Sequence, residues 1–375
     1  MSFSEWKKYK LSDVVEIKYG KDHKHLSIGE IPVYGSGGIM RFADKFLYDK
    51  ESILIPRKGT LSNLFYLNKP FWSVDTMFYT KIIEGNNGKF LYYLLKSIDL
   101  ASMNVGSAVP SLTTEILNKL EINLPNKATQ TKIANILSAI DDKIELNRQT
   151  NQTLETIAET LFKEMCLPVN EVLPDGWKQD KLNTIIEYIV DNRGKTPPIS
   201  TDESNSIPLI EVNALVGSSI ITNTSLSRKG VTRETFNTWF RKGHPKNGDV
   251  LFSTVGTIGE VSLIFNEEVC IAQNIIALRS SMSGSFLYFS LKNIKNDLLS
   301  LDVSSVQPSI KVPHLLDFKI IIPPNNIILE FENNVKGILE LIYINNQETL
   351  TLIALLNSLL PKLMKGEIDL DISKI

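Results

Sequence analysis

The motifs of this sequence that suggest catalysis each lack a residue that the chemistry requires. RGKT at Arg193–Thr196 is similar to a phosphate-binding loop, but Ile189 stands where such a loop needs its first glycine. The glycine-rich YGSGGI at Tyr34–Ile39 has neither the GxGxxG spacing nor a following helical pattern of a dinucleotide site. His23 and His25 fit one face of a strand, but no third metal ligand is close in the sequence. We therefore expect loops at these positions, and no metal site.

Two further motifs concern DNA chemistry and also fail. TPPI at Thr196–Ile199 lacks the Asn or Asp that begins the tetrapeptide of amino-methyltransferases, and no cofactor-binding glycine motif precedes it. The EIK segment at Glu16–Lys18 has an aspartate only three residues upstream, which is too close for the metal-binding carboxylates of many nucleases. We therefore expect no catalytic residue in this chain.

Basic, amide, hydroxyl and aromatic side chains cluster in the predicted turns of two segments, 1–127 and 167–325. Arginine fits guanine edges and phosphates, lysine neutralises phosphate, and asparagine pairs with adenine. Any one of these residues alone is more often a solvated surface group, so only the clustering indicates binding to duplex DNA. The candidates are Lys21, His23, Lys24, His25, Tyr34, Ser36, Arg41, Arg57 and Lys58 in the first segment, and Asn192, Arg193, Lys195, Asn213, Arg228, Lys229, Arg233, Arg241 and Lys242 in the second.

Length and composition predict at least two folded domains. The chain has 375 residues, of which 43% are hydrophobic, and a single core stops growing near ~250–300 residues. Cys166 and Cys270 have no CxxC spacing, which favours buried thiols in a reducing compartment. The sequence shows no apolar signal core and no window near the ~18 apolar residues of a membrane span. We expect a cytoplasmic protein with no membrane partner.

The net charge of −2 hides an uneven distribution. Residues 1–127 carry 17 Lys and Arg against 13 Asp and Glu, and residues 177–322 carry 15 against 14. Residues 128–176 carry 4 against 8, and residues 323–375 carry 4 against 7. Positive charge therefore lies on the two larger segments, where it favours contact with an anion.

The sequence repeats itself. WKKYKLSDVVEIKYGK at Trp6–Lys21 matches WKQDKLNTIIEYIVDNRGK at Trp177–Lys195, and FLYYLL at Phe90–Leu95 matches FLYFSL at Phe286–Leu291. The offset is 171 residues at the start and settles at 198 later in the repeat. The second copy has therefore gained residues near its front, around 196–246. A repeat of this length predicts two similar folded units.

Each copy of the repeat ends in a long helical pattern, from about 130 to 165 and from about 328 to 363. Each predicted helix is on the order of 50 Å long. The narrow apolar seam favours a two-helix antiparallel coiled coil over a helical hairpin buried in one globule. The seam residues are Ile133, Leu137, Ile140, Ile144, Leu154, Ala158, Leu161 and Met165, and, 198 positions later, Phe331, Val335, Ile338, Ile342, Leu352, Leu356, Leu359 and Leu363.

The middle of each seam is polar. Asn147 and Asn151 occupy it in the first helix, and Asn345 and Thr349 in the second. In an antiparallel pair, Asn147 lies opposite Thr349 and Asn151 opposite Asn345. Buried amides that pair across a coiled coil fix its register, because a slipped alignment leaves them without partners. We expect these four residues to set the register.

The order of globular segment, long helix, globular segment and long helix resembles the specificity subunits of type I restriction-modification systems. The resemblance covers essentially the whole chain. It rests on W…KL opening each half, GS…PS before each closing strand, and LLPKLMKGEIDL at Leu359–Leu370. It implies an α+β fold with a pseudo-twofold internal repeat, in which two globular α/β target-recognition domains are joined by two long antiparallel helices. The implied boundaries are 1–127 and 167–325 for the domains, 128–166 and 326–366 for the spacer helices, and 367–375 for a tail.

The resemblance also implies a function. Such a subunit is not an enzyme; it reads a bipartite DNA target with two different half-sites and a fixed gap. It docks two DNA methyltransferase subunits and the restriction and translocase subunits, which would hold S-adenosylmethionine, ATP and Mg, with no cofactor in this chain. One alternative is a stand-alone DNA-modifying enzyme, which the missing catalytic motifs disfavour. The other is a coiled-coil scaffold that does not bind DNA, which the basic loop clusters disfavour.

Overall fold

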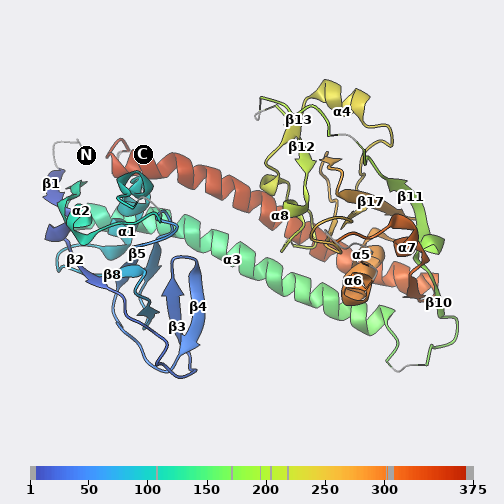
Figure 1. Ribbon diagram of the computed structural model, residues 1–375, viewed down its shortest axis with the longest axis horizontal. Coiled ribbons are helices and arrows are strands. Elements are labelled where there is room, and N and C mark those ends of the chain that lie inside the picture. Colours follow the sequence, from blue (N-terminus) through green and yellow to red (C-terminus); the bar gives the residue numbers. More distant parts are fainter. Residues whose placement is uncertain are drawn as a thin grey trace. The chain divides into compact units, whose positions relative to one another are not determined.

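The chain folds into two compact units. Unit 1 comprises Met1–Glu145 together with Thr349–Ile375, and unit 2 comprises Leu146–Glu348 (Figure 1). No helix of the described chain is long and apolar enough to cross a membrane. The computed structural model describes residues 6–106, 109–169, 172–194, 196–202, 205–217, 219–300, 302 and 308–368.

Unit 1 contains two main sheets and a short strand pair. The four-stranded antiparallel sheet has the order β2-β8-β5-β6, and the three-stranded sheet has the order β4-β3-β7, in which β3 and β7 run parallel. β1 pairs with β9. The strands are β1 (Lys7–Lys10), β2 (Val15–Tyr19), β3 (Ile31–Gly35), β4 (Gly38–Ala43), β5 (Ser52–Pro56), β6 (Phe65–Leu67), β7 (Trp72–Ser73), β8 (Met77–Ile82) and β9 (Glu121–Leu124).

The helices of unit 1 cover the four-stranded sheet. Every residue of β5 is buried, as expected for an apolar run in the middle of a sheet with both faces covered. Asn87 caps α1 by accepting a hydrogen bond from the Phe90 N–H, while its own N–H donates to Gln130 on the long helix α3 at 2.9 Å. The helical elements are η2 (Leu11–Asp13), α1 (Gly88–Lys96), η3 (Leu100–Met103) and α2 (Thr114–Lys119).

Unit 2 repeats this topology. Its four-stranded sheet has the order β11-β17-β14-β15, its three-stranded sheet the order β13-β12-β16 with β12 parallel to β16, and β10 pairs with β18. The internal repeat predicted from sequence is therefore confirmed strand by strand. The strands are β10 (Lys178–Lys181), β11 (Ile186–Val190), β12 (Ile207–Ile210), β13 (Gly230–Val231), β14 (Val250–Ser253), β15 (Val261–Leu263), β16 (Cys270–Ile271), β17 (Ile275–Ser280) and β18 (Lys319–Ile322).

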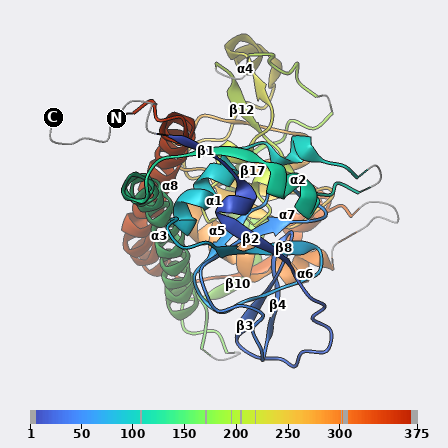
Figure 2. The ribbon, with the colours of Figure 1, turned by 90° about the vertical axis from the view of Figure 1, so that its left-hand side faces the viewer.

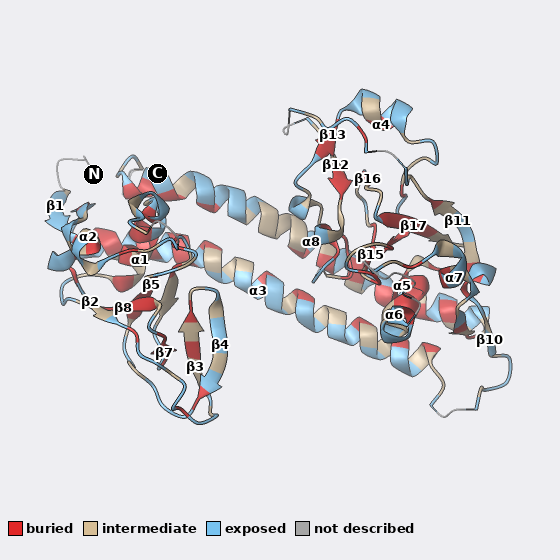
Figure 3. Ribbon diagram, viewed as in Figure 1, coloured by how far each residue is buried: buried red, intermediate tan, exposed pale blue. Residues whose placement is uncertain are grey.

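Among the described residues, unit 2 has counterparts of the four helical elements of unit 1 and three additional ones. Figure 3 shows α5 and β17 as largely buried, since they form the centre of the unit. The side chain of Ser283 caps α5 and donates to the Glu332 carboxylate on the long helix α8. The helical elements are η4 (Leu182–Ile185), η5 (Val212–Ala214), η6 (Thr224–Leu226), α4 (Arg233–Trp239), α5 (Gly284–Asn293), α6 (Lys295–Leu299) and α7 (Val312–Asp317).

The residues gained by the second copy extend mainly two loops. Residues 211–229 connect β12 to β13, where 36–37 alone connect β3 to β4. Residues 232–249 connect β13 to β14 and carry α4, where the shorter loop 44–51 connects β4 to β5. This is the region in which the change of sequence offset predicts an insertion.

Each long helix closes one copy of the repeat. α3 spans Lys127–Cys166 and begins after Asn126, whose side chain accepts from the Thr129 N–H. α8 spans Asn325–Met364 and ends before Gly366, whose φ of 67° is the left-handed conformation that commonly terminates a helix. Within unit 2 the two helices run antiparallel, because Asn147 bonds to Glu348 while Met165 meets Asn334 (Figures 1 and 2).

The seam predicted for these helices is confirmed, but the buried face is wider than the seam. All sixteen predicted seam residues are buried or half-buried in the two core clusters that include the helices. Phe162, Leu339 and Leu360 are also buried, although they lie outside the seam. The reason is that each unit packs its own α1 or α5 against the helices, so the helices belong to the domain cores as well as to each other. Cys166 and Cys270 are buried free thiols, and burial raises the pKa of each to about 12.

Candidate nucleic-acid interface

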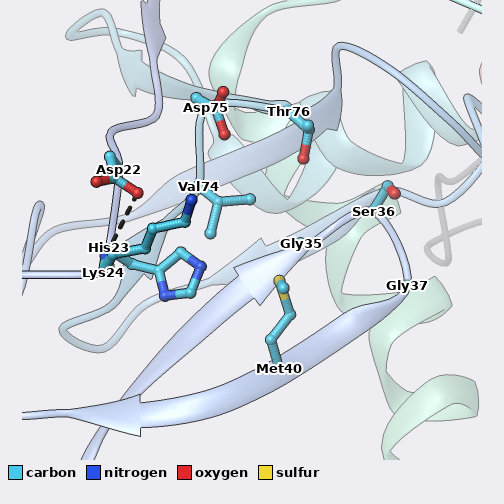
Figure 4. Close-up of a pocket in the computed structure, with 10 residues that line it drawn as sticks. All are labelled: Asp22, His23, Lys24, Gly35, Ser36, Gly37, Met40, Val74, Asp75 and Thr76. Atoms are coloured by element: carbon cyan, nitrogen blue, oxygen red, sulfur yellow. Dashed lines mark hydrogen bonds between the residues drawn. The ribbon is translucent and has the colours of Figure 1, made fainter.

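In unit 1, a pocket of about 580 Å³ lies where the parallel strands β3 and β7 end. Parallel strands that end together bring the loops that follow them to one edge of the sheet. Three loops line this pocket: residues 22–24 after β2, residues 35–37 at the β3–β4 turn, and residues 74–76 before β8. Figure 4 shows the imidazole of His23, the thioether of Met40 and the hydroxyl of Thr76 around it.

The first of these loops is held rigidly. A Cβ on Gly20 would lie 2.0 Å from the Val74 carbonyl oxygen, so only glycine permits this close approach of the two chains. The Lys21 N–H donates to the Ser73 carbonyl at 2.8 Å, and the Trp72 indole N–H donates to the Lys21 carbonyl at 2.9 Å. The side chains of Lys21 and Lys24 remain exposed. The loop therefore presents positive charge on a fixed backbone.

His23 contributes an unused polar atom to this pocket. Its ring is half-buried, and its Nδ1 atom is buried without a hydrogen-bond partner among the described residues. Ser36, across the pocket, is positioned because the Asn63 side-chain amide donates to its carbonyl at 2.7 Å. These two side chains are available to a ligand that offers hydrogen-bonding groups.

Arg57 and Lys58 lie beside the same pocket. Their N–H groups both donate to the Thr76 carbonyl, at 2.8 and 3.2 Å. The Arg57 guanidinium donates to the Asp75 carbonyl at 3.1 Å and lies 5.4 Å from the centre of the Tyr19 ring. Lys58 is exposed. Six predicted residues therefore gather here, namely Lys21, His23, Lys24, Ser36, Arg57 and Lys58.

Of the nine predicted residues of unit 1, only His23, Lys24 and Ser36 line the pocket itself, and Lys21, Arg57 and Lys58 lie beside it. The other three are Arg41, Tyr34 and His25. Arg41 donates to the carbonyls of Leu26 and Ser27, at 3.0 and 3.3 Å. Tyr34 packs against Phe65, with ring centres 5.4 Å apart. His25 is exposed and meets Trp72 edge-on at 5.7 Å. Arg41 and Tyr34 therefore support the loops rather than extend from them.

Unit 2 has a pocket at the corresponding place, where β12 and β16 end. It measures about 250 Å³ and is lined by Thr196, Pro197, Leu209, Glu211, Lys229, Ala272, Gln273 and Asn274. Lys229 forms an ion pair with Glu211 at 2.8 Å, and the Gln273 amide donates to the Thr196 hydroxyl at 2.5 Å. Its polar groups are thus amides, a hydroxyl and a carboxylate, with one lysine that is already paired.

The backbone around the two pockets is the same. In unit 1 the Gly59 N–H donates to Pro110 and the Leu112 N–H to Arg57; in unit 2 the Gly256 N–H donates to Pro308 and the Ile310 N–H to Thr254. The side chains differ, because Arg57 and Lys58 of unit 1 correspond to Thr254 and Val255 of unit 2. The same backbone arrangement therefore presents different side chains in the two units.

A second pocket of unit 2, of about 580 Å³, lies between the end of β11 and the loop after α4. It brings together four predicted residues, Asn192, Arg193, Arg241 and Lys242. Arg193 forms an ion pair with Asp191 at 2.5 Å, and this hydrogen-bonded guanidinium lowers the pKa of the Asp191 carboxyl.

The other predicted residues of unit 2 are dispersed. The Asn213 amide donates to the Leu226 carbonyl at 3.0 Å, and Arg233 makes a two-pronged ion pair with Glu268, with both contacts at 2.7 Å. Arg228 is exposed and lines neither pocket. Lys195 lies outside the described residues.

Sequence reasoning missed several pocket residues, including Thr76, Gln273, Asn274 and Trp239. Thr76 and Asn274 occupy equivalent positions 198 residues apart, immediately before β8 and β17. The repeat offset combined with the parallel strand ends is the signal that identifies them. Trp239 belongs to the insertion, for which the first copy offers no equivalent.

The polar residues at the middle of the seam pair within unit 2. The Asn345 amide donates to Asn151 Oδ1 at 2.8 Å, and the Asn151 amide donates to Asn346 Oδ1 at 2.8 Å. The Asn147 amide donates to the Glu348 carboxylate at 2.8 Å. Asn147, Asn151 and Asn345 are all buried. Thr349 belongs to unit 1.

Comparison with known proteins agrees with this fold and its duplication. The family model described as "Type I restriction modification DNA specificity domain" matches twice, over residues 3–156 and 174–357. The chain is 24% identical to the type I restriction enzyme MjaIX specificity subunit of Methanocaldococcus jannaschii, over 87% of this chain and 79% of the relative. It is 25% identical to the HindI specificity subunit of Haemophilus influenzae, over 76% of this chain and 80% of the relative.

One solved structure shares the whole fold. The crystal structure of the type I restriction-modification system S subunit from M. genitalium aligns with a TM-score of 0.67 at 17% identity, covering 96% of each chain. The chain belongs to the type I restriction-modification DNA specificity family. It is the DNA specificity subunit of such a system, and a non-catalytic one.

Proposed function

We propose that this chain recognises a bipartite duplex DNA target, with one half-site bound by residues 1–127 and the other by residues 167–325. The observation that supports it is the pair of corresponding pockets. Each lies at the end of a parallel strand pair, on the same backbone frame, with different side chains. Two similar frames with unlike groups suit a target whose two half-sites differ.

The chemistry of each pocket favours different bases. In unit 1, Arg57, Lys58 and Lys24 are donors that match the acceptor pair of guanine in the major groove. In unit 2, Gln273 and Asn274 carry amides, which match adenine. The half-site of unit 1 therefore contains guanine at the contacted position, and that of unit 2 contains adenine.

The spacer helices, residues 128–166 and 326–366, are proposed to dock two methyltransferase subunits, with the restriction and translocase subunits joining that complex. Apolar side chains exposed on α3 and α8 within unit 2 support this, since they pack against no core of their own unit: Leu146, Ile157, Leu329, Leu341 and Ile344. S-adenosylmethionine, ATP and Mg belong to the partner subunits in this scheme, and this chain holds no cofactor. The complex is expected to act in the cytoplasm.

The buried asparagines are proposed to fix the register of α3 against α8. Asn345 donates to Asn151, which in turn donates to Asn346, so a shift along the helices would leave buried amides without these partners. Register in turn sets the gap of the target. A single permitted register gives a single gap length.

The test is a genome-wide map of N6-methyladenine with and without the gene for this chain. We expect one bipartite motif to lose methylation and all other motifs to keep it. Re-expression of the chain restores that motif and serves as the control. Loss of an uninterrupted motif, or no loss in a strain that expresses the chain and its partners, would refute the proposal.

The competing function is a stand-alone DNA methyltransferase. We expect the purified chain to transfer no methyl group from S-adenosylmethionine to duplex DNA, and transfer to begin when the methyltransferase subunits are added. Methyl transfer by the chain alone would favour the competing function.

A further inference from the structure

We propose that the insertion of unit 2 grips the phosphate backbone of duplex DNA without reading its sequence. The grip consists of Trp239, Arg241 and Lys242 around the pocket of about 580 Å³ beside the end of β11. The inference rests on the proposed function and extends it, because it assigns a second kind of DNA contact that is separate from the base-reading pocket between β12 and β16. The described part of unit 1 holds no counterpart, because the loop 44–51 takes the place of 232–249.

The loop that follows α4 is pinned to β11 and to the residues just beyond it. The Asn192 side-chain amide donates to the Gly243 carbonyl at 3.1 Å, while its oxygen accepts from the Lys242 N–H at 3.4 Å. The Tyr188 hydroxyl donates to the Lys242 carbonyl at 3.2 Å. Three hydrogen bonds therefore fix the backbone of the residues that carry the charge, so little conformational entropy is lost when they bind a ligand.

The inner side of the insertion is packed against the rest of unit 2. Phe236 is buried, and the His244 ring stacks on it at 3.5 Å with an interplanar angle of 9°. His244 Nε2 lies 2.8 Å from the Phe236 carbonyl. The ion pair of Arg233 with Glu268 ties the start of α4 to the loop before β16. These contacts hold α4 and the loop that follows it in a fixed position.

The outer side carries unpaired charge and an exposed indole. Arg241 and Lys242 are exposed, and their side chains make no hydrogen bond or ion pair with any residue that the structure describes. Trp239 is 38% exposed. The one carboxylate in the pocket, Asp191, is already paired with Arg193. The Lys242 charge also acts on Asp191, but neither Arg241 nor Lys242 is held in an ion pair, so an anion entering this pocket meets two exposed cations.

The groups that discriminate between bases are occupied here. Both ends of the Asn192 amide are used by the loop, and the Thr238 hydroxyl donates to the Glu234 carbonyl at 2.8 Å. What remains is positive charge, which binds any phosphate, and an aromatic face, which stacks on any base or sugar. The pocket therefore suits the DNA backbone and not a particular sequence.

The charge distribution explains why unit 2 needs a local phosphate contact. Residues 177–322 carry 15 Lys and Arg against 14 Asp and Glu, so this segment has almost no general attraction for a polyanion. The pocket between β12 and β16 adds little, because Lys229 there is paired with Glu211. Two exposed cations held together by the insertion supply the attraction locally.

The test measures the salt dependence of DNA binding by the chain assembled with its methyltransferase subunits. The double variant Arg241→Gln, Lys242→Gln is compared with wild type on a duplex that carries the methylated motif and on one that lacks it. We expect the slope of log K against log salt to become shallower by about 1 to 2, since each lost phosphate contact removes about 0.9. The methylated motif is expected to stay the same.

Two further variants support the reading of this result. Lys311→Gln, Lys319→Gln removes the same charge from exposed positions elsewhere in unit 2 and should leave the slope unchanged. Trp239→Ala should weaken binding to both duplexes by a similar factor, on the order of tenfold, without changing the slope. Because the side chains of Arg241 and Lys242 have no partner in the described structure, thermal unfolding of the double variant should match wild type.

An unchanged slope in the double variant would overturn the proposal, as would an equal change in the Lys311 and Lys319 control. A changed methylation motif would show that the residues read bases. Failure of the proposed function is distinguishable, because the wild-type complex itself would then show no preference for either duplex.

Discussion

The two units attach to the long helices through opposite chemistry at one equivalent position. In unit 1 the Tyr93 hydroxyl on α1 donates to the Asp141 carboxylate on α3 at 2.6 Å. In unit 2 the corresponding residues of α5 and α8 are Phe289 and Leu339, which are 1% and 2% exposed. A polar pair in one copy has become an apolar pair in the other.

This difference shows that the side chains of each domain and of the long helix on which it packs are complementary to each other. Exchange of only one member in unit 2 would place a hydroxyl or a carboxylate against an apolar surface, and in unit 1 it would leave the Asp141 carboxylate without its donor. The two copies share the same backbone, whereas the side-chain pair that joins the domain to its long helix differs between them. The following changes test this.

The largest effect is expected from Leu339→Asp, which buries a carboxylate beside Phe289. We expect the free energy of unfolding to fall by about 3–5 kcal/mol, as for a buried charge without a partner. The double variant Phe289→Tyr, Leu339→Asp recreates the pair of unit 1 and should recover part of the loss. Chemical denaturation of the full chain measures both, and equal losses in the single and double variants would mean that the pair is not transferable.

The two pockets that we propose to contact bases should respond differently to truncation. Arg57→Ala removes a guanidinium of unit 1 and should weaken DNA binding of the assembled complex by ~1–3 kcal/mol if it contacts a guanine edge. Thr254→Ala, at the equivalent position of unit 2, should have a much smaller effect. Arg193→Ala should also weaken binding, because it leaves the Asp191 carboxylate uncompensated. No effect from either arginine would place the DNA on another face.

A comparison of single and double changes tests the asparagine layer. Asn345→Leu alone leaves Asn151 without its donor and should destabilise the chain by ~1–3 kcal/mol. Asn151→Leu, Asn345→Leu removes both members of this hydrogen bond and leaves only the half-buried Asn346 side chain without its donor, so most of the lost stability should return. The gap of the methylated motif should become variable in the double variant. A motif with an unchanged single gap would show that register is set elsewhere.

The smallest effect expected is a pH dependence confined to unit 2. Burial lowers the pKa of His244, whose Nδ1 has no acceptor among the described residues. Below the pKa of the unfolded chain, near 6.5, the unfolded state takes up a proton that the folded state resists, so stability is present above that pH and falls below it. Hydrogen exchange at pH 7.5 and 5.5 should show loss of protection around α4, and His244→Phe should abolish it. Equal loss in unit 1 would contradict this.

The elements that follow from local periodicity were predictable from the sequence. The seam of each long helix is such an element, because apolar spacing along one helix does not depend on the rest of the chain. The width of the buried face was not predictable, since Phe162 packs against Phe286 and Phe289 of α5, which lies far away in the sequence.

The candidate site shows the same limit. Several of the predicted basic loops lie at the ends of the parallel strands, but Asn192, Asn213 and Arg41 use their polar groups within the protein. The partner of Asn192 is a loop about fifty residues further along the chain, which no local pattern reveals. A side chain suited to DNA is therefore available to DNA only if it is not already hydrogen-bonded to a backbone group of the protein.

The most direct test of the account is an exchange of residues 1–127 for the same segment of a relative with a different target, followed by a genome-wide map of N6-methyladenine. We expect one half of the bipartite motif to change to that of the relative, while the other half and the gap stay the same. A motif in which both halves change, or in which the gap changes, would contradict the claim that the two copies read separate half-sites on one frame.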